Sequence, residues 1–228
     1  VKDGIPGFDI YVKEGIALND QHNKAYSATG LKPSNKLPKN PKDARGLIEF
    51  MCSTFYDIRT FGAVMSTSIN CGQVRGPIQM NFAKSIDPIF QQEVGITRVT
   101  VTRRGEEKET EIGRKMIVPY GLYRMEGYVS ANLARKTTGF SEEDLELFWE
   151  SITNMFEHDH SASRGKMVTR KLFIFKHDSP LGNYPSHKLF ELIDVKKIND
   201  GPPRSYSDYE IVVKREELPS TVELLEKI

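Results

Sequence analysis

Cysteine is nearly absent from this sequence, which has only Cys52 and Cys71 among 228 residues. Two cysteines at this spacing provide neither a disulfide framework nor a recognisable metal-binding motif. Such usage is typical of a chain that works in a reducing environment, so a cytoplasmic location is expected. Cys52 lies in an apolar pattern of helical spacing and is predicted to be buried.

Long apolar runs and a one-sided charge are also missing. No segment approaches the roughly 20 apolar residues that cross a bilayer, so no membrane association is expected. Because 32 basic and 31 acidic residues give a net charge of +1, no global field attracts nucleic acid. A surface that binds nucleic acid would therefore have to be local. The length is sufficient for one domain with a sizeable core.

Two stretches have the apolar spacing of amphipathic helices. Asp43 is the expected N-cap of a helix over 44–56, whose stripe is predicted to face the core and consists of Leu47, Ile48, Met51 and Phe55. Ser141 to Asp144 forms a capping box before a second helix. Its stripe is predicted to be core rather than a platform for stacking bases, and consists of Leu145, Phe148, Trp149, Ile152, Met155 and Phe156.

Several shorter segments are predicted strands, namely 78–82, 122–129, 171–177 and 209–214. Residues 219–228 are predicted to form a short terminal helix. The first forty residues contain a potential strand over Phe8 to Val12 and a helical turn or two over Asn19 to Tyr26. They are interpreted as an irregular excursion without a core of its own. Strands that alternate with two good helices indicate an α+β fold.

Arginine beside glycine marks the segment from Phe55 to Phe82. Its predicted loop contains Arg59-Thr60-Phe61-Gly62 and Arg75-Gly76-Pro77. Glycine lets the backbone approach a bulky anion, and a guanidinium offers a planar fork of donors. This combination suits phosphate, although a glycine turn beside an exposed arginine is also common in proteins without such a site.

The same segment carries a family resemblance. The runs Tyr56-Asp57-Ile58-Arg59-Thr60-Phe61-Gly62-Ala63-Val64-Met65 and Gly72-Gln73-Val74-Arg75-Gly76-Pro77-Ile78-Gln79 resemble the signatures D-x-R-x-F-G-A-V-M and G-x-V-R-G-P-V-Q of the Cas-seven family. These CRISPR-associated proteins form the repeating backbone of guide-RNA complexes, and the similarity is greatest to the subtype I-C, or Dvulg, branch. Further similar runs follow in the same order at 85–89, 118–123, 140–145 and 155–159.

The resemblance implies a ferredoxin-like (RRM-like) palm with a fingers insertion and a protruding β-hairpin thumb. Residues 1–42 are then the fingers-like insertion, 43–94 the first part of the palm, 95–121 the thumb-like arm and 122–228 the second part of the palm. The N-terminal strand and basic helix of the family have no counterpart here. A chain that starts at Val1 is expected to expose unpaired sheet edges, and so to be poorly soluble or to borrow a strand.

The pattern over the predicted arm agrees with a β-ribbon that stands in solvent. Residues Ile96 to Arg103 alternate, a turn follows at 104–106, and 107–113 is strongly charged. By pattern alone such a hairpin need have no role. The resemblance implies instead a thumb that reaches onto the next copy and wedges an apolar side chain, Met116 or Ile117, into the nucleic acid.

By resemblance the chain is a non-catalytic RNA-binding backbone subunit of a type I-C interference complex (Cascade), a ribonucleoprotein of antiviral defence. Its copies form a head-to-tail homo-oligomer along one crRNA, present that guide to target DNA, and bind Cas-five and Cas-eight type subunits. No cofactor and no metal are expected. The expected RNA contacts are Arg59, Phe61, Gly62, Arg75, Gly76, Arg98, Arg114 and Lys115. A glycine beside basic residues adds Arg164 and Lys166 as a second possible RNA contact.

The run Glu157-His158-Asp159-His160 leaves alternatives open. A His-Asp doublet can ligate a divalent cation, but the remaining histidines show no ligand spacing. Capping of the preceding helix by a protonated histidine is the simpler interpretation. The alternative function is a guide-processing endoribonuclease with His158, His160 or Tyr120 as general base, although these residues lack a visible set of catalytic partners.

Overall fold

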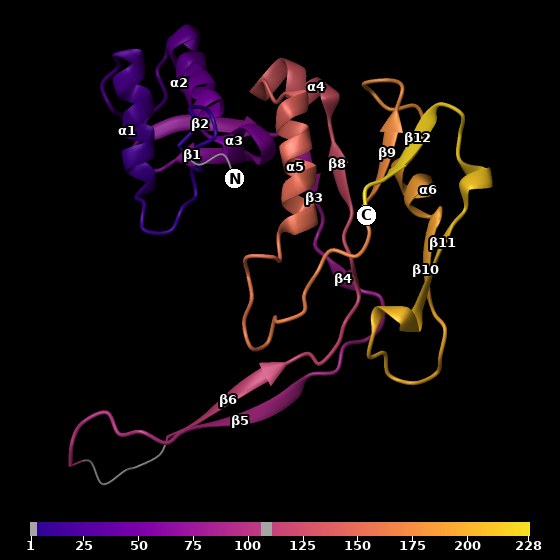
Figure 1. Ribbon diagram of the computed structural model, residues 1–228. Helices are drawn as coiled ribbons and strands as arrows, with labels where there is room; N and C mark the ends of the chain where they lie inside the picture. Colours follow the sequence, from indigo (N-terminus) through magenta and orange to yellow (C-terminus); the bar gives the residue numbers. More distant parts are fainter. Residues whose placement is uncertain (1–3, 106–110) are drawn as a thin grey trace.

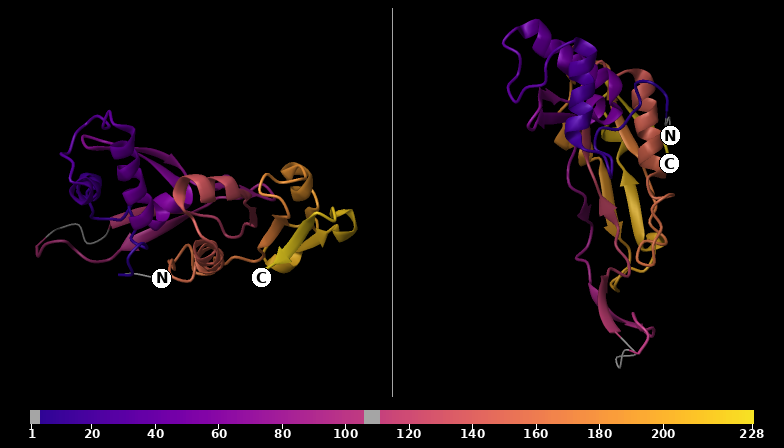
Figure 2. Two further views of the ribbon diagram at one scale, coloured as in Figure 1. Left: turned by 90° about the horizontal axis from the view of Figure 1, so that it is seen from above. Right: turned by 90° about the vertical axis from the view of Figure 1, so that its left-hand side faces the viewer.

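The computed structural model describes residues 4–105 and 111–228. Figure 1 shows an N-terminal, a central and a C-terminal part next to one another, with a two-stranded arm that extends from the foot of the central part. The arm projects from the body in the right-hand view of Figure 2 as well. Each of the three parts has its own hydrophobic cluster. The predicted mixture of helices and antiparallel strands is confirmed.

The N-terminal part packs helices on a two-stranded ribbon. Helices α1 (Leu18–Thr29) and α2 (Pro41–Thr54) precede the short α3 (Tyr56–Phe61), and β1 (Gly62–Ser66) pairs antiparallel with β2 (Asn70–Arg75). Leu47, Met51 and Phe55 are fully buried, as their stripe predicts. The N-cap of α2 is Asn40 and not the predicted Asp43, because the Asn40 side chain accepts the Lys42 N–H and proline begins the helix.

The first forty residues are more regular than predicted. The expected strand over Phe8 to Val12 is wrong, since the described chain has only an isolated parallel bridge there, between Asp9 and Phe55. The expected helical turn or two is the 12-residue α1. Its Tyr26 is buried in the same cluster as Phe55, so this region contributes to the core.

The central part contains two short strand pairs and one longer helix. Strand β3 (Ile78–Met80) pairs with β8 (Gly127–Val129), and β4 (Lys84–Ser85) pairs with β7 (Tyr123–Arg124). The helical turn α4 (Ala131–Leu133) runs into the π-helix η1 (Ala134–Thr138), and α5 (Glu142–Asn154) then begins at the predicted capping box. Ile78 and Phe148 are buried in one cluster with flanking residues of α5.

Two predicted strands are shorter than their alternation suggests. The segment 78–82 forms only β3, and Phe82 beyond its end is 96% exposed instead of buried. The segment 122–129 is divided into β7 and β8, which pair with different strands. Because α5 ends at Asn154, Met155 is exposed, so its predicted place in the core stripe is wrong.

The C-terminal part consists of two antiparallel pairs with short helices between the strands. Strand β9 (Phe173–His177) pairs with β12 (Val222–Glu226), and β10 (Ile193–Lys197) pairs with β11 (Tyr209–Val213). The connections contain α6 (Ser186–Phe190), η2 (Tyr206–Asp208) and η3 (Arg215–Glu217). The strands predicted over 171–177 and 209–214 are confirmed. The predicted terminal helix is wrong, because β12 forms there and buries Val222 beside Leu189.

The arm is an antiparallel hairpin of β5 (Gln92–Arg98) and β6 (Glu111–Ile117) that stands in solvent, as predicted. All seven residues of β5 are exposed. The strand ends at Arg98, five residues before the end of the predicted alternation. Residue 106 of the predicted turn and residues 107–110 of the predicted charged segment lie outside the described residues.

Every sheet in the described part of the chain has two strands. The ferredoxin-like palm and the division into palm, fingers and thumb therefore remain predictions. None of the described helices is both long and apolar enough to cross a membrane.

Candidate nucleic-acid interface

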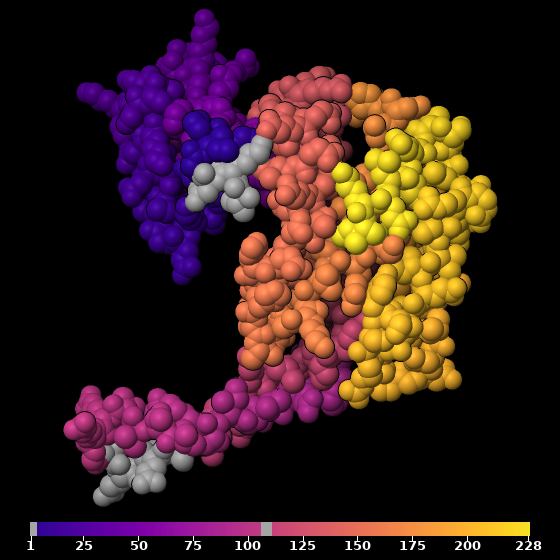
Figure 3. Space-filling model, viewed as in Figure 1, coloured from indigo at the N-terminus to yellow at the C-terminus, as the bar shows by residue number. Residues whose placement is uncertain are grey.

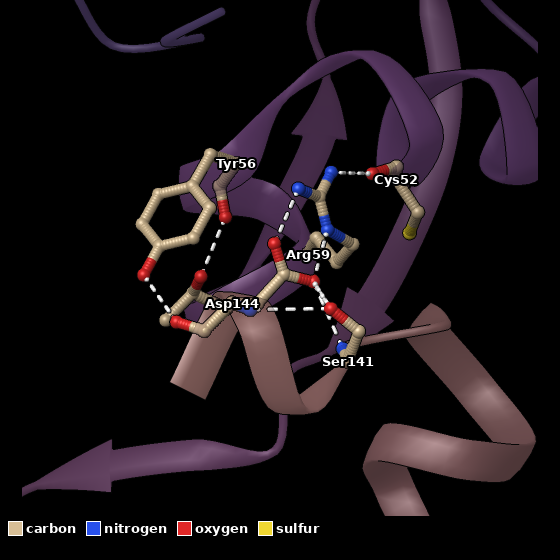
Figure 4. A network of polar contacts seen from close by, with 6 residues as sticks. Cys52, Tyr56, Arg59, Ser141 and Asp144 are labelled. Atoms are coloured by element: carbon tan, nitrogen blue, oxygen red, sulfur yellow. Dashed lines mark hydrogen bonds and ion pairs between the residues drawn. The ribbon is translucent and has the colours of Figure 1, made fainter. Parts of the chain in front are cut away.

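Arg59 lies at the centre of a buried polar network (Figure 4). It belongs to α3, and only 6% of its surface is exposed. Its Nε and one terminal nitrogen donate to the two Asp144 carboxylate oxygens at 2.9 and 2.8 Å, and the other terminal nitrogen donates to the Cys52 carbonyl at 2.8 Å. The predicted loop position is therefore wrong. The guanidinium joins α2 and α3 to the first turn of α5.

The ion pair is satisfied within the protein. Burial by itself raises the pKa of Asp144, but hydrogen bonds from Arg59 and Ser141 outweigh burial and hold that pKa below its ordinary value. The rings of Phe8 and Tyr56 lie 5.4 and 5.6 Å from the guanidinium carbon. Arg59 would have to leave these partners to bind a phosphate.

Gly62 and Gly76 bring two backbone segments into direct contact. A Cβ added to Gly62 would lie 2.4 Å from the Gly76 nitrogen, and a Cβ added to Gly76 would lie 2.2 Å from the Phe61 carbonyl carbon. Gly62 also has a φ of +79°, which favours glycine. Its N–H donates to the Ile58 carbonyl. Close backbone packing therefore accounts for both glycines, and the Gly62 amide is already bonded.

Arg75 lies on the solvent side of the β1–β2 ribbon. The register places Val64, Gln73 and Arg75 on one face, and the opposite face packs on the N-terminal cluster. Arg75 is exposed, and its guanidinium has no hydrogen bond or ion pair within residues 4–105 and 111–228. Val64 is 72% exposed, and Phe61 is exposed directly before the ribbon. An unpaired arginine beside exposed apolar groups suits both a phosphate and a base.

The arm carries three of the predicted contacts, Arg98, Arg114 and Lys115. Arg98 pairs with Glu111 at 2.8 Å, and Arg114 approaches Glu93 at 3.6 Å, both across the hairpin. Such exposed pairs contribute only about 0–1 kcal/mol. A phosphate can therefore compete with the carboxylate for either cation.

The foot of the arm is fixed to the C-terminal part. The Tyr209 hydroxyl donates to Asp87 at 2.6 Å, and Arg124 donates to the carbonyls of Ile193 and Phe190 at 2.6 Å each. Burial, together with the bond to Asp87, raises the pKa of Tyr209 above its ordinary value, so the hydroxyl stays a donor. The arm therefore projects from an anchored base.

Met116 and Ile117, the two candidate wedge residues, point to opposite faces of the hairpin. Adjacent residues of a strand alternate in direction. Met116 shares its face with Arg114, whereas Ile117 shares the other face with Lys115 and Ile96. Met116 is 55% exposed, and Ile117 is half-buried. Only one of the two can face a given partner.

The exposed loop after α5 holds the remaining basic candidates, Arg164 and Lys166. Arg164 forms an exposed ion pair with Asp159. For Lys166 the described chain provides no hydrogen bond or ion pair. Lys166 is therefore open to an anion, and Arg164 can exchange its partner.

The candidate catalytic residues are not brought together. His158 and His160 are exposed, and no described contact joins them to Tyr120, whose ring stacks on Tyr209 at 6.5 Å. Among the residues that the structure describes, no group of three or more His, Cys, Asp or Glu is placed to hold a metal ion.

The predicted contacts do not form one pocket. The β1–β2 ribbon and the arm lie at opposite ends of the molecule (Figures 1 and 2). Figure 3 shows a hollowed side bordered by the N-terminal part, the orange loop after α5 and the magenta arm. Surfaces so far apart suit an extended ligand better than a small one.

Several exposed cations were not predicted. A cavity of about 490 Å³ lies beside the Arg59 network, and Arg135 and Lys136 of η1 are part of its lining. Both are exposed. A second basic region precedes and enters α2, where residues 32–45 contain five basic residues and one acidic residue. That excess was visible in the sequence, whereas the closeness of η1 to α2 was not.

The comparisons with known proteins agree with the resemblance at the level of the family. The family model described as "CRISPR-associated protein Cas7" matches residues 1–214. No individual curated protein matches the sequence significantly.

Proposed function

The chain belongs to the Cas7 family of CRISPR-associated proteins, and from this premise we propose that it is a non-catalytic, RNA-binding backbone subunit of a type I-C Cascade. Its copies polymerise head-to-tail along a crRNA and present it for pairing with target DNA, beside Cas-five and Cas-eight type subunits. The protein holds phosphates and sugars, while base pairing reads the sequence.

The observation that carries this proposal is the arm. In the described chain β5 and β6 pair only with each other, and every residue of β5 is exposed. The arm adds nothing to the hydrophobic core of the described chain, but its base is held in place by hydrogen bonds. Such an element is suited to contact a second molecule. A head-to-tail contact that does not close produces an open helix of copies, along which a single strand can lie.

Arg75 and Phe61 are the proposed grip on the guide at the other end of the molecule. Arg75 is unpaired in the described chain, and Phe61 can stack on a base. Arg59, Gly62 and Gly76 act indirectly, because the buried ion pair and the glycine contact hold the ribbon that presents Arg75.

Met116 is the proposed wedge. Its face also carries Arg114, whose cation can hold the phosphate beside a displaced base. Ile117 faces the other way with Val94 and Ile96, and these aliphatic side chains suit the next protein copy, while Lys115 on the same face stays available to an anion. The two residues therefore have different expected effects when they are shortened.

The main test is expression of the full chain with its companion subunits and a guide RNA. RNA in a large, nuclease-sensitive assembly is expected for the wild type, and less RNA is expected for Arg75→Ala. Lys176→Ala, which removes an exposed cation of β9, is the control and is expected to match the wild type. A wild-type chain that stays an RNA-free monomer with all components present would refute the proposal.

The wedge is tested with a fluorescent base analogue in the paired strand. Fluorescence from displaced bases is expected in the wild type and in Ile117→Ala, and is expected to be lost in Met116→Ala. Ile117→Ala is expected to weaken assembly instead. Equal effects of the two variants on both readouts would contradict the assignment of faces.

A further inference from the structure

One side of α2 carries cations and leads to the cavity. Lys42 and Arg45 are three residues apart, and Glu49 and Ser53 continue the same side of the helix at four-residue steps. Glu49 and Ser53 line the cavity of about 490 Å³. A ligand that lies along Lys42 and Arg45 therefore reaches the cavity within about two helical turns.

The α2 residues in the lining, Glu49, Cys52 and Ser53, are not basic, but another wall of the cavity is. It is formed by η1, which contacts α2 and carries Arg135 and Lys136 on exposed positions. Arg59 and Asp144 also line the cavity, as an ion pair without net charge. A π-helix is rare, and such turns occur frequently at functional sites.

The segment before α2 carries two further cations on a backbone that is held in place. The Ser34 carbonyl accepts the Asn70 N–H at 2.8 Å, and Leu37 packs beside Gly72. Lys36 and Lys39 lie in this anchored stretch and are exposed. Their positions are therefore held by β2, unlike those of lysines on a loose tail.

None of these cations has an ion pair within the described chain, so none has to leave a carboxylate before it binds a phosphate. Exposed cations such as Lys171 and Arg98 do have one, with Glu226 and Glu111. Only two carboxylates, Asp43 and Glu49, lie among them on α2. In a chain with a net charge of +1, this is a strong local excess. The six cations are Lys36, Lys39, Lys42, Arg45, Arg135 and Lys136.

We propose that these six cations form a track for the phosphate backbone of a nucleic acid, which runs along α2 into the cavity between α2 and η1. The proposal rests on the proposed function and adds a site separate from Arg75 and from the arm. The phosphates belong either to the guide RNA or to the DNA strand paired with it. The chemistry of recognition is the same for both.

The test compares three double variants of the full chain. Lys42→Gln/Arg45→Gln removes the cations of α2, and Arg135→Gln/Lys136→Gln removes those of η1. Lys176→Gln/Lys196→Gln is the control, because both of these lysines are exposed but ion-paired. Melting temperatures verify that all three variants fold. Two affinities are each measured over a series of salt concentrations. One is the binding of a labelled single-stranded RNA, followed by anisotropy, and the other is the capture of complementary DNA by RNA-loaded protein.

Each track variant is expected to reduce the slope of log affinity against log salt by about 1.4, since a single strand loses about 0.7 per phosphate contact. A reduced slope for RNA alone assigns the track to the guide, and a reduced slope only in DNA capture assigns it to the paired strand. If either track variant matches the control on both ligands, the continuous track is refuted, while loss of RNA in Arg75→Ala would still support the proposed function. A wild type that binds neither ligand would refute both.

Discussion

Separation of the Arg59–Asp144 pair is expected to destabilise the whole chain, because the pair joins the N-terminal and central parts. The two side chains are only 8% and 4% exposed. Removal of one partner of such a buried pair costs about 3–5 kcal/mol. The two partners are unequal. Asp144 without Arg59 keeps the donors of Ser141, whereas Arg59 without Asp144 keeps only the Cys52 carbonyl, and the Ser141 N–H loses its acceptor in the capping box of α5. Arg59→Met is therefore expected near the lower end of the range and Asp144→Leu near the upper end.

Thermal unfolding followed by circular dichroism measures this effect. A chain of this size loses about 2–4 °C in melting temperature per kcal/mol, so single variants are expected to melt about 6–20 °C below the wild type. Arg59→Met/Asp144→Leu is expected to regain most of the loss, since apolar residues of similar volume often replace a buried ion pair without cost. Arg215→Met, which breaks an exposed pair with Glu226, is the control and is expected to change little.

One result would overturn this reasoning. If Arg59→Met has the melting temperature of the wild type but no longer binds RNA, then Arg59 is a direct RNA contact. The ion pair would then not hold the N-terminal and central parts together. Loss of stability without recovery in the double variant would mean that the site needs its charges for another reason.

Three further predictions concern the N-terminal part. Gly62→Ala is expected to lower the melting temperature, because its Cβ would lie 2.4 Å from backbone atoms, whereas Gly95→Ala in the arm meets nothing within 4 Å; equal melting would contradict the close contact. Burial lowers the pKa of His22 below its ordinary value of about 6.5, so the stability that neutral His22 contributes is present above pH 6.5 and is lost as the pH falls below it. The melting temperature of the wild type is therefore expected to fall with pH below about 6.5, and that of His22→Gln to change much less. Burial raises the pKa of the Cys52 and Cys71 thiols to about 11, so both are expected to react slowly with a thiol reagent until the chain unfolds, and fast labelling of the native chain would contradict their burial.

Local patterns predicted the elements whose stability is local. The capping box at Ser141 and the stripe of Leu47, Met51 and Phe55 identify two helices, because caps and amphipathic spacing depend on residues within a few turns. The hairpin of the arm was also predicted from alternation. These elements needed no information about distant parts of the chain.

Other features depend on distant partners and could not be predicted in the same way. Arg59 meets a carboxylate 85 residues further along the chain, so its burial left no local signal. Residues 219–228 are rich in Glu and Leu, which favour a helix, but pairing of β12 with β9 outweighs that preference. Phe82 fits the alternation of a buried strand, but β3 ends before it. The run of cations before α2 was present in the sequence and needed only a local count.

The separate strand pairs also affect how the chain behaves at high concentration. Each strand of the described chain has one partner, so each has one edge of unpaired backbone groups. Such edges can accept a strand from another molecule through main-chain hydrogen bonds, with little regard to side chains. Short strands limit this risk in the body, and charged residues such as Glu93 and Arg98 limit it in the arm. Resistance to aggregation therefore depends on strand brevity and charge, since no sheet of the described chain is closed on itself.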